Sequence, residues 1–206
     1  MTIILFGIFW GFIEATLGGL LHAIRFPMTG SIMAPIGFAI LFMASRRKAS
    51  GAQLVTISAI AASFKFFDIF LFGLSPFQLA IVNPAQAILL QGLSFTAFAW
   101  LVKAPSPVKK LLGATAMTAT SVVLFNLTGH FIAGQAGVPL FTNQLTVSIL
   151  HTLAAIVATY LLIGLASKID QVSIETFTLG NASFAMRAVT GAILVVTALA
   201  VHKWLI

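Results

Sequence analysis

Residues 3–24, IILFGIFWGFIEATLGGLLHAI, form an apolar run long enough to cross a lipid bilayer as a single helix. Crossing the hydrocarbon core takes about 20 consecutive, mainly apolar residues. The run contains one carboxylate, Glu14, four residues before the Gly18-Gly19 pair and eight before His22. A carboxylate in the middle of a span is costly in lipid, so its presence here needs a reason.

The composition extends this interpretation to the whole chain. Of its 206 residues, 60% are hydrophobic and only 7% are charged, whereas a soluble domain carries roughly 25% charged residues. We therefore predict that residues 1–206 form a single integral membrane domain surrounded by the lipid bilayer. The chain has no cysteine, which excludes disulfides and thiolate chemistry. The basic residues behind its formal net charge of +7 lie mostly between apolar runs, with Lys65 inside a predicted helix, so we expect no nucleic-acid partner.

The apolar runs predict an all-α fold, a polytopic transmembrane helical bundle of six to seven helices. Proline, glycine and serine separate the runs, and the segment 170–185 is polar enough to be a surface loop or an interfacial helix. The last run is the least certain span. The candidate helices are 3–24, 30–46, 52–73, 77–102, 108–134, 142–169 and 186–206.

The basic residues predict the orientation of this bundle. Eight of them fall on one side of the predicted spans, against Arg25 and Lys203 on the other. By the positive-inside rule the N-terminus is cytoplasmic, in a multi-pass protein of the cell inner (plasma) membrane. Residues 1–12 lack the basic region and cleavage site of a signal peptide, so we expect a retained helix. The eight residues are Arg46, Arg47, Lys48, Lys103, Lys109, Lys110, Lys168 and Arg187.

With this orientation, nearly all strongly polar side chains of the spans lie at or above the membrane midplane. A proton or ion conduit would carry polar groups through the full thickness, whereas this set predicts a pocket that opens outward above an apolar plug. Pro84 adds to it, because a proline frees a backbone carbonyl in the preceding turn. The candidate substrate-binding residues are Glu14, Lys65, Asp68, Asn83, Gln86, Gln91, Asn126, His130 and His151.

Several of these residues also have structural interpretations. Glu14 is either a ligand-binding or proton-carrying carboxylate, or a structural acid held by Lys65 or a histidine. Lys65 and Asp68 are spaced i,i+3, which favours a structural salt bridge. The histidines fit interhelical hydrogen bonds, or metal or haem ligation. Two acids against one lysine would favour a cationic or zwitterionic ligand over an anionic one.

Enzyme signatures are missing from the sequence. It contains no Gly-x-Ser-x-Gly, no phosphate-binding loop and no paired-histidine metal spacing. We therefore predict that the protein is not an enzyme and has neither a cofactor nor a metal site, and that it cannot drive ATP-dependent transport by itself.

One face of the first helix is built from small residues. At 100° per residue these share an arc of roughly 140° with Glu14, while Trp10 and other bulky residues lie outside it. Small residues allow helices to approach closely. The residues are Gly7, Gly11, Ala15, Gly18 and Gly19.

In length, number of helices, outward polar pocket and small-residue first helix, the chain resembles the substrate-binding S components of energy-coupling factor transporters. The resemblance implies capture of a vitamin, a vitamin precursor or a metal ion from outside. It also implies docking, through Gly7, Gly11, Ala15 and Gly19, on a coupling membrane protein that carries ATPase subunits.

The functional prediction is therefore a membrane transport protein that captures a small water-soluble molecule, as an S subunit or a small solitary transporter. Two alternatives stay open. One is a haem-binding or redox membrane protein with His130 and His151 as axial ligands. The other is a proton-coupled carrier in which Glu14 takes up and releases the proton.

Overall fold

The computed structural model describes residues 2–24, 26, 28–73, 75–132 and 143–173, and every regular element within these residues is helical. Six spans in the described part are long and apolar enough to cross a membrane, which confirms the predicted all-α bundle. The predicted helix 186–206 lies outside the described residues. The elements are α1 (Thr2–Ile13), the π-helical turn η1 (Glu14–Gly18), α2 (Gly19–Ala23), α3 (Thr29–Arg46), α4 (Gly51–Ser63), the 3₁₀ turn η2 (Phe64–Phe66), α5 (Phe67–Phe72), α6 (Leu79–Lys103), α7 (Pro107–Ile132) and α8 (Asn143–Ser173).

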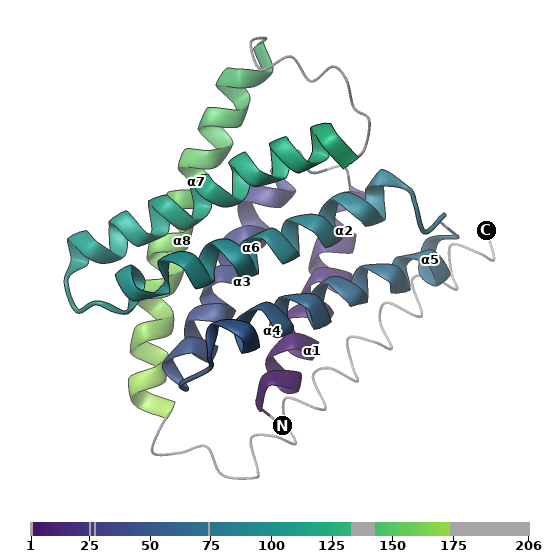
Figure 1. Ribbon diagram of the computed structural model, residues 1–206. Helices are drawn as coiled ribbons and strands as arrows, with labels where there is room; N and C mark the ends of the chain where they lie inside the picture. The colour runs from purple at the N-terminus through teal and green to yellow at the C-terminus, as the bar shows by residue number, and fades with distance from the viewer. Residues whose placement is uncertain (1, 25, 27, 74, 133–142, 174–206) are drawn as a thin grey trace.

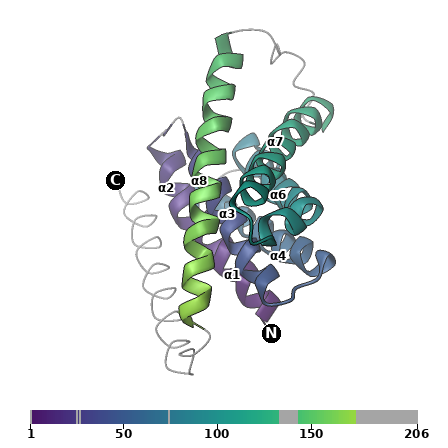
Figure 2. The same ribbon diagram turned by 90° about the vertical axis from the view of Figure 1, so that its left-hand side faces the viewer.

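The helices form two layers that cross steeply (Figures 1 and 2). Helices α4, α6 and α7 lie side by side in one layer, and α1, α3 and α8 make up the other. Between the layers, α1 packs on α4, α3 on α6 and α8 on α7. Two predicted spans are interrupted helices: α1 continues through η1 into α2, and α4 continues through η2 into α5.

Local sequence explains where several helices begin and end. Ser50 caps α4 by accepting a hydrogen bond from the Gln53 backbone, while the Gln53 side chain accepts one from the Ser50 backbone. Pro107 is the first residue of α7, a position at which proline loses no helical hydrogen bond. Gly73 ends α5 in the left-handed conformation, with φ of 63°. The sequence predicts that a polar surface segment begins at residue 170. In the structure residues 170–173 still belong to α8, which continues to Ser173.

The α3–α4 loop, the α6–α7 loop and the C-terminal end of α8 lie at one end of the bundle (Figure 1). The described basic residues Arg46, Arg47, Lys48, Lys103, Lys109, Lys110 and Lys168 are at this end. We refer to these seven residues as the basic end.

The core is aromatic, and the outer surface is strongly apolar. Trp10, Phe38 and Phe95 are completely buried between the two layers. Large apolar side chains such as Phe70, Trp100 and Leu161 are exposed, as expected for a surface that faces lipid.

Helices α4 and α6 approach closely at Gly92. A Cβ built on Gly92 would overlap Ser58 Oγ and lie 2.7 Å from Ser58 Cβ. Ser58 is fully buried and donates to the Leu54 backbone carbonyl, so its hydroxyl is already engaged. The contact is therefore a small-residue helix crossing of the kind that membrane proteins favour.

We expect Gly92→Ala to lower the free energy of unfolding by about 1–3 kcal/mol, because the added methyl pushes α4 and α6 apart. Gly164→Ala is the matched control, since a Cβ at Gly164 meets nothing within 4 Å. The measurement is unfolding in mixed micelles at increasing SDS, followed by far-ultraviolet circular dichroism. Equal unfolding curves for the two variants would contradict the close packing at Gly92.

Candidate functional site

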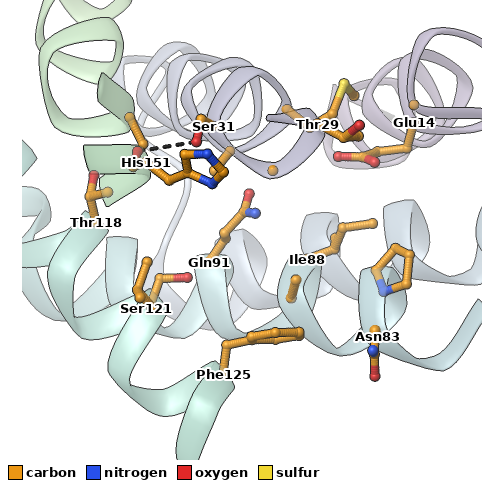
Figure 3. A pocket seen from close by; sticks show the side chains of 18 of the residues that line it. Glu14, Thr29, Ser31, Asn83, Ile88, Gln91, Thr118, Ser121, Phe125 and His151 are labelled. Carbon is orange, nitrogen blue, oxygen red and sulfur yellow. Dashed lines mark hydrogen bonds between the residues drawn. The ribbon is translucent and has the colours of Figure 1, made fainter. Parts of the chain in front are cut away.

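A cavity of about 620 Å³ lies between the two layers, and all six described spans contribute to its wall. It is lined by the C-terminal parts of the α1 span and α7, and by the N-terminal parts of α3, α6 and α8. These are the parts farther from the basic end. Figure 3 shows Glu14 at one side of the cavity and Thr118, Ser121 and His151 at the other, with Gln91 and Ile88 between them.

The structure brings six of the nine predicted site residues to this cavity: Glu14, Lys65, Asn83, Gln91, Asn126 and His151. Asp68 is not part of the lining but contacts Lys65. Gln86 is also outside the lining and donates from Nε2 to Thr128 Oγ1, so it joins α6 to α7. His130 is in α7, and its side chain lies outside the described part. The haem alternative, which needs His130 with His151, therefore stays a prediction.

Glu14 is the first residue of the π turn in the first span. Such turns contain one extra residue per turn and are frequent at functional sites. The side chain is 4% exposed, and its Oε1 accepts a hydrogen bond from Trp10 Nε1 at 3.3 Å. Its other oxygen, Oε2, faces Gly18, where a Cβ would lie only 3.2 Å away. Trp10 Nε1 thus holds one carboxylate oxygen, and the missing side chain of Gly18 leaves space beside the other.

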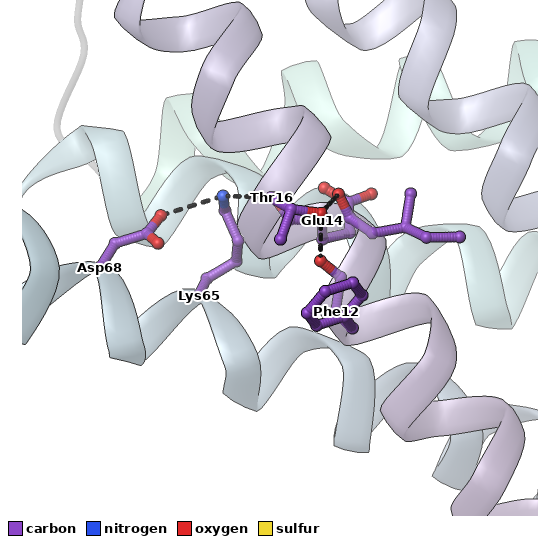
Figure 4. Close-up of polar contacts among 6 residues, drawn as sticks. Phe12, Glu14, Thr16, Lys65 and Asp68 are labelled. Atoms are coloured by element: carbon purple, nitrogen blue, oxygen red, sulfur yellow. Dashed lines mark hydrogen bonds and ion pairs between the residues drawn. The ribbon is translucent and has the colours of Figure 1, made fainter. Parts of the chain in front are cut away.

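Lys65 connects the two interrupted spans. It is on the 3₁₀ turn η2 and is 2% exposed. Its Nζ donates to the Glu14 backbone carbonyl at 3.2 Å and forms a salt bridge with Asp68 Oδ2 at 3.0 Å (Figure 4). The i,i+3 pairing of Lys65 with Asp68 that the sequence predicts is therefore present. A buried ammonium needs such partners, because an unpaired charge in this environment is strongly destabilising.

Gln91 projects from α6 toward the opposite layer. Its side chain is 5% exposed, and within the described residues Oε1 has no hydrogen-bond partner. A Cβ on Gly37 of α3 would lie 2.5 Å from this oxygen, so glycine is needed there to admit the amide. The same glycine makes room for the Trp10 ring. A buried amide that lines a cavity without using its full hydrogen-bonding capacity is suited to bind a ligand.

The wall opposite Glu14 carries hydroxyl and imidazole groups (Figure 3). Ser31 Oγ donates to the His151 backbone carbonyl at 3.1 Å, which joins α3 to α8. Asn126 Nδ2 donates to the Val122 carbonyl in its own helix at 2.8 Å. Thr118 and Ser121 complete this wall from α7. Among the described lining residues, Glu14 and Lys65 are the charged ones.

The small-residue face of the first helix is used partly inside the chain. A Cβ on Gly7 would lie 2.7 Å from Ile60 Cβ, and one on Gly11 would lie 2.5 Å from the Phe64 ring. Both glycines therefore let α4 and η2 approach α1, and in this structure they are covered. Docking of a partner through Gly7, Gly11, Ala15 and Gly19 stays a prediction, and through the first two it requires α4 to move away.

Several residues of the site are not predicted by the sequence pattern. Trp10 falls on the bulky side of the first helix, yet it is fully buried and donates to Glu14; the i,i+4 spacing of the two residues is a usable signal. Thr118, Ser121 and Phe125 recur at helical spacing on α7 and line the cavity together. Hydroxyl side chains are weak signals in a span, because they can bond their own backbone, as Thr16 does to the Phe12 carbonyl.

Comparison with known proteins gave no match among family models, curated proteins or solved structures. Functional inference for this chain therefore depends on the geometry of the cavity.

We expect Lys65→Met to lower the free energy of unfolding by about 3–5 kcal/mol, because it removes the buried ammonium that pairs with Asp68 at 3.0 Å. The double variant Lys65→Met/Asp68→Asn should recover part of the loss, because it also removes the carboxylate with which Lys65 pairs. SDS unfolding of wild type, both single variants and the double variant gives the coupling energy. Additive effects of the two substitutions would show that the ion pair has no energetic role.

Proposed function

We propose that the protein is a membrane transport protein that captures a small water-soluble molecule in the cavity between its two helix layers. The observation that carries this proposal is the pair of buried polar side chains, Glu14 and Gln91, on the wall of a 620 Å³ cavity. Small-molecule sites commonly occupy about 300–1,000 Å³ and combine apolar walls with a few polar groups. Polar groups that are buried beside a cavity are expensive to maintain unless something binds them.

The cavity is proposed to open to the outside of the cell. It lies toward the end of the bundle opposite the basic end, and the positive-inside rule assigns basic ends to the cytoplasm. On the inner side, the completely buried Phe95 and Val102 of α6 belong to the apolar core. A molecule bound at Glu14 would then need a conformational change to reach the cytoplasm.

Two modes of transport fit this arrangement, both in the inner membrane. As an S subunit, as the resemblance to energy-coupling factor transporters implies, the protein would deliver its ligand with a coupling membrane protein and ATPase subunits. As a solitary transporter, it would move the ligand by rearrangement of its own layers. The absence of a phosphate-binding loop in the sequence requires any ATP-driven step to come from a partner.

The orientation can be tested with single cysteines, because the chain contains none of its own. We expect Gly30→Cys, near the N-terminal end of α3, to react with a membrane-impermeant maleimide added to intact spheroplasts. Lys48→Cys, in the α3–α4 loop, should react only after permeabilisation. Both positions are exposed, so accessibility within the protein does not limit the reaction. The reverse labelling pattern would refute an outward-facing cavity.

Capture of a molecule can be tested by mass spectrometry of small molecules that co-purify with the protein. We expect at least one species to be enriched with the wild type and depleted by more than about tenfold in Ala87→Phe, a loss equivalent to 1.4 kcal/mol or more. Ala87 lines the cavity on α6, and the added ring would fill part of it. Gly164→Ala, which is remote from the cavity wall, serves as the control and should retain the species. Equal recovery from all three proteins, or no enriched species, would contradict the proposal.

A further inference from the structure

We infer that the ligand of this cavity carries a protonated nitrogen with N–H donors at one end and a neutral hydrogen-bonding group at the other. The inference rests on the proposed function and adds the chemical class of the molecule captured. It follows from the distribution of charge and hydrogen-bonding capacity around the cavity.

The Glu14 carboxylate has unused hydrogen-bonding capacity. A carboxylate can accept about four hydrogen bonds on its two oxygens. Among the described residues, Trp10 Nε1 is the one donor to it, and that bond is to Oε1. The opposite oxygen faces Gly18, which has no side chain to cover it. This leaves Oε2 for a donor from a molecule in the cavity.

The neighbouring lysine does not serve as that donor. Two of its three N–H groups are directed to the Glu14 backbone carbonyl and to Asp68. Lys65 Nζ forms its salt bridge with Asp68, at 3.0 Å, and not with the Glu14 carboxylate. Among the described residues, Glu14 is therefore the carboxylate that lines the cavity without a salt bridge. A cation at Glu14 would be stabilised, and an anion there would be repelled.

Away from Glu14, the cavity wall changes character. Ile88 and Phe125 line its middle, and the far wall presents the Ser121 hydroxyl and the His151 imidazole (Figure 3). Thr118, on the same wall, donates its hydroxyl to Thr159 Oγ1. Within the described lining, this far wall has no carboxylate and no Lys or Arg side chain. It therefore matches a neutral donor or acceptor, with an apolar body between the two ends of the ligand. Gln91, between the ends, adds an amide side chain to the lining.

The test uses two series of probes whose members differ only at one end. The first is tyramine, tyrosol and 4-hydroxyphenylacetate, which end in an ammonium, a hydroxyl and a carboxylate. The second is serotonin, 5-hydroxytryptophol and 5-hydroxyindole-3-acetate, with the same three ends on a larger ring. Dissociation constants are measured by calorimetry on the purified full chain in detergent, at one pH and one salt concentration.

We expect the amine of at least one series to bind wild type more than about tenfold tighter than its alcohol and its acid, as for a charge-assisted hydrogen bond. Glu14→Gln should remove this preference, because it keeps an acceptor for Trp10 and deletes the charge. Asp68→Asn is the matched acid-to-amide control: it removes the same charge from the cluster but does not line the cavity. It should reduce the preference less than Glu14→Gln does.

Each variant is first checked for monodisperse elution and a wild-type far-ultraviolet circular dichroism spectrum under the conditions of the binding experiment. The conservative Glu14→Asp is used in place of Glu14→Gln if the latter fails. Three results would overturn the inference. They are a preference for the acid or the alcohol, no preference in either series, and a preference for the amine that survives loss of the Glu14 charge or position.

The nature of the co-purifying species separates the two proposals. A cavity-dependent species that is anionic or lacks a basic nitrogen overturns the amine ligand alone, whereas no cavity-dependent species overturns capture itself.

Discussion

The rest of the structure depends on how one buried ammonium is held. Lys65 is nearly inaccessible, and it is stabilised by the Asp68 carboxylate and by the backbone carbonyl of Glu14. The bond to that carbonyl comes from a 3₁₀ turn in one span and ends on a π turn in another. Each of the two helix interruptions thus carries one partner of this hydrogen bond. The cluster joins α1 to the α4–α5 span and fixes the position of the Glu14 side chain.

The cluster also determines which charge the cavity receives. Because Lys65 is bonded to Asp68 and to a backbone oxygen, the Glu14 carboxylate has no close salt-bridge partner among the described residues. Glycines then set the space around it: Gly18 leaves one carboxylate oxygen uncovered, and Gly37 admits both Trp10 and Gln91. Charge and shape at this side of the cavity thus come from a few residues on four spans.

Much of the fold follows directly from the sequence. The six described spans match the apolar runs within a few residues, and the i,i+3 spacing of Lys65 and Asp68 predicts their salt bridge. Six site residues could be placed together because polar groups in spans avoid lipid. The π and 3₁₀ turns could not be predicted, since they depend on contacts between spans and not on local pattern. For the same reason the sequence could not show that Gln86 bonds Thr128 or that Gly7 is covered by α4.

The position of Trp10 has a consequence for how the molecule can be observed. Its indole is completely buried and hydrogen-bonded to Glu14, whereas Trp100 is two-thirds exposed on the outer surface. Indole emission depends on the polarity and charge next to the ring, so a cation arriving at Glu14 changes the surroundings of Trp10 and leaves those of Trp100 unchanged. The chain therefore carries an intrinsic optical reporter at the carboxylate, and replacing Trp100 with phenylalanine would remove one source of background.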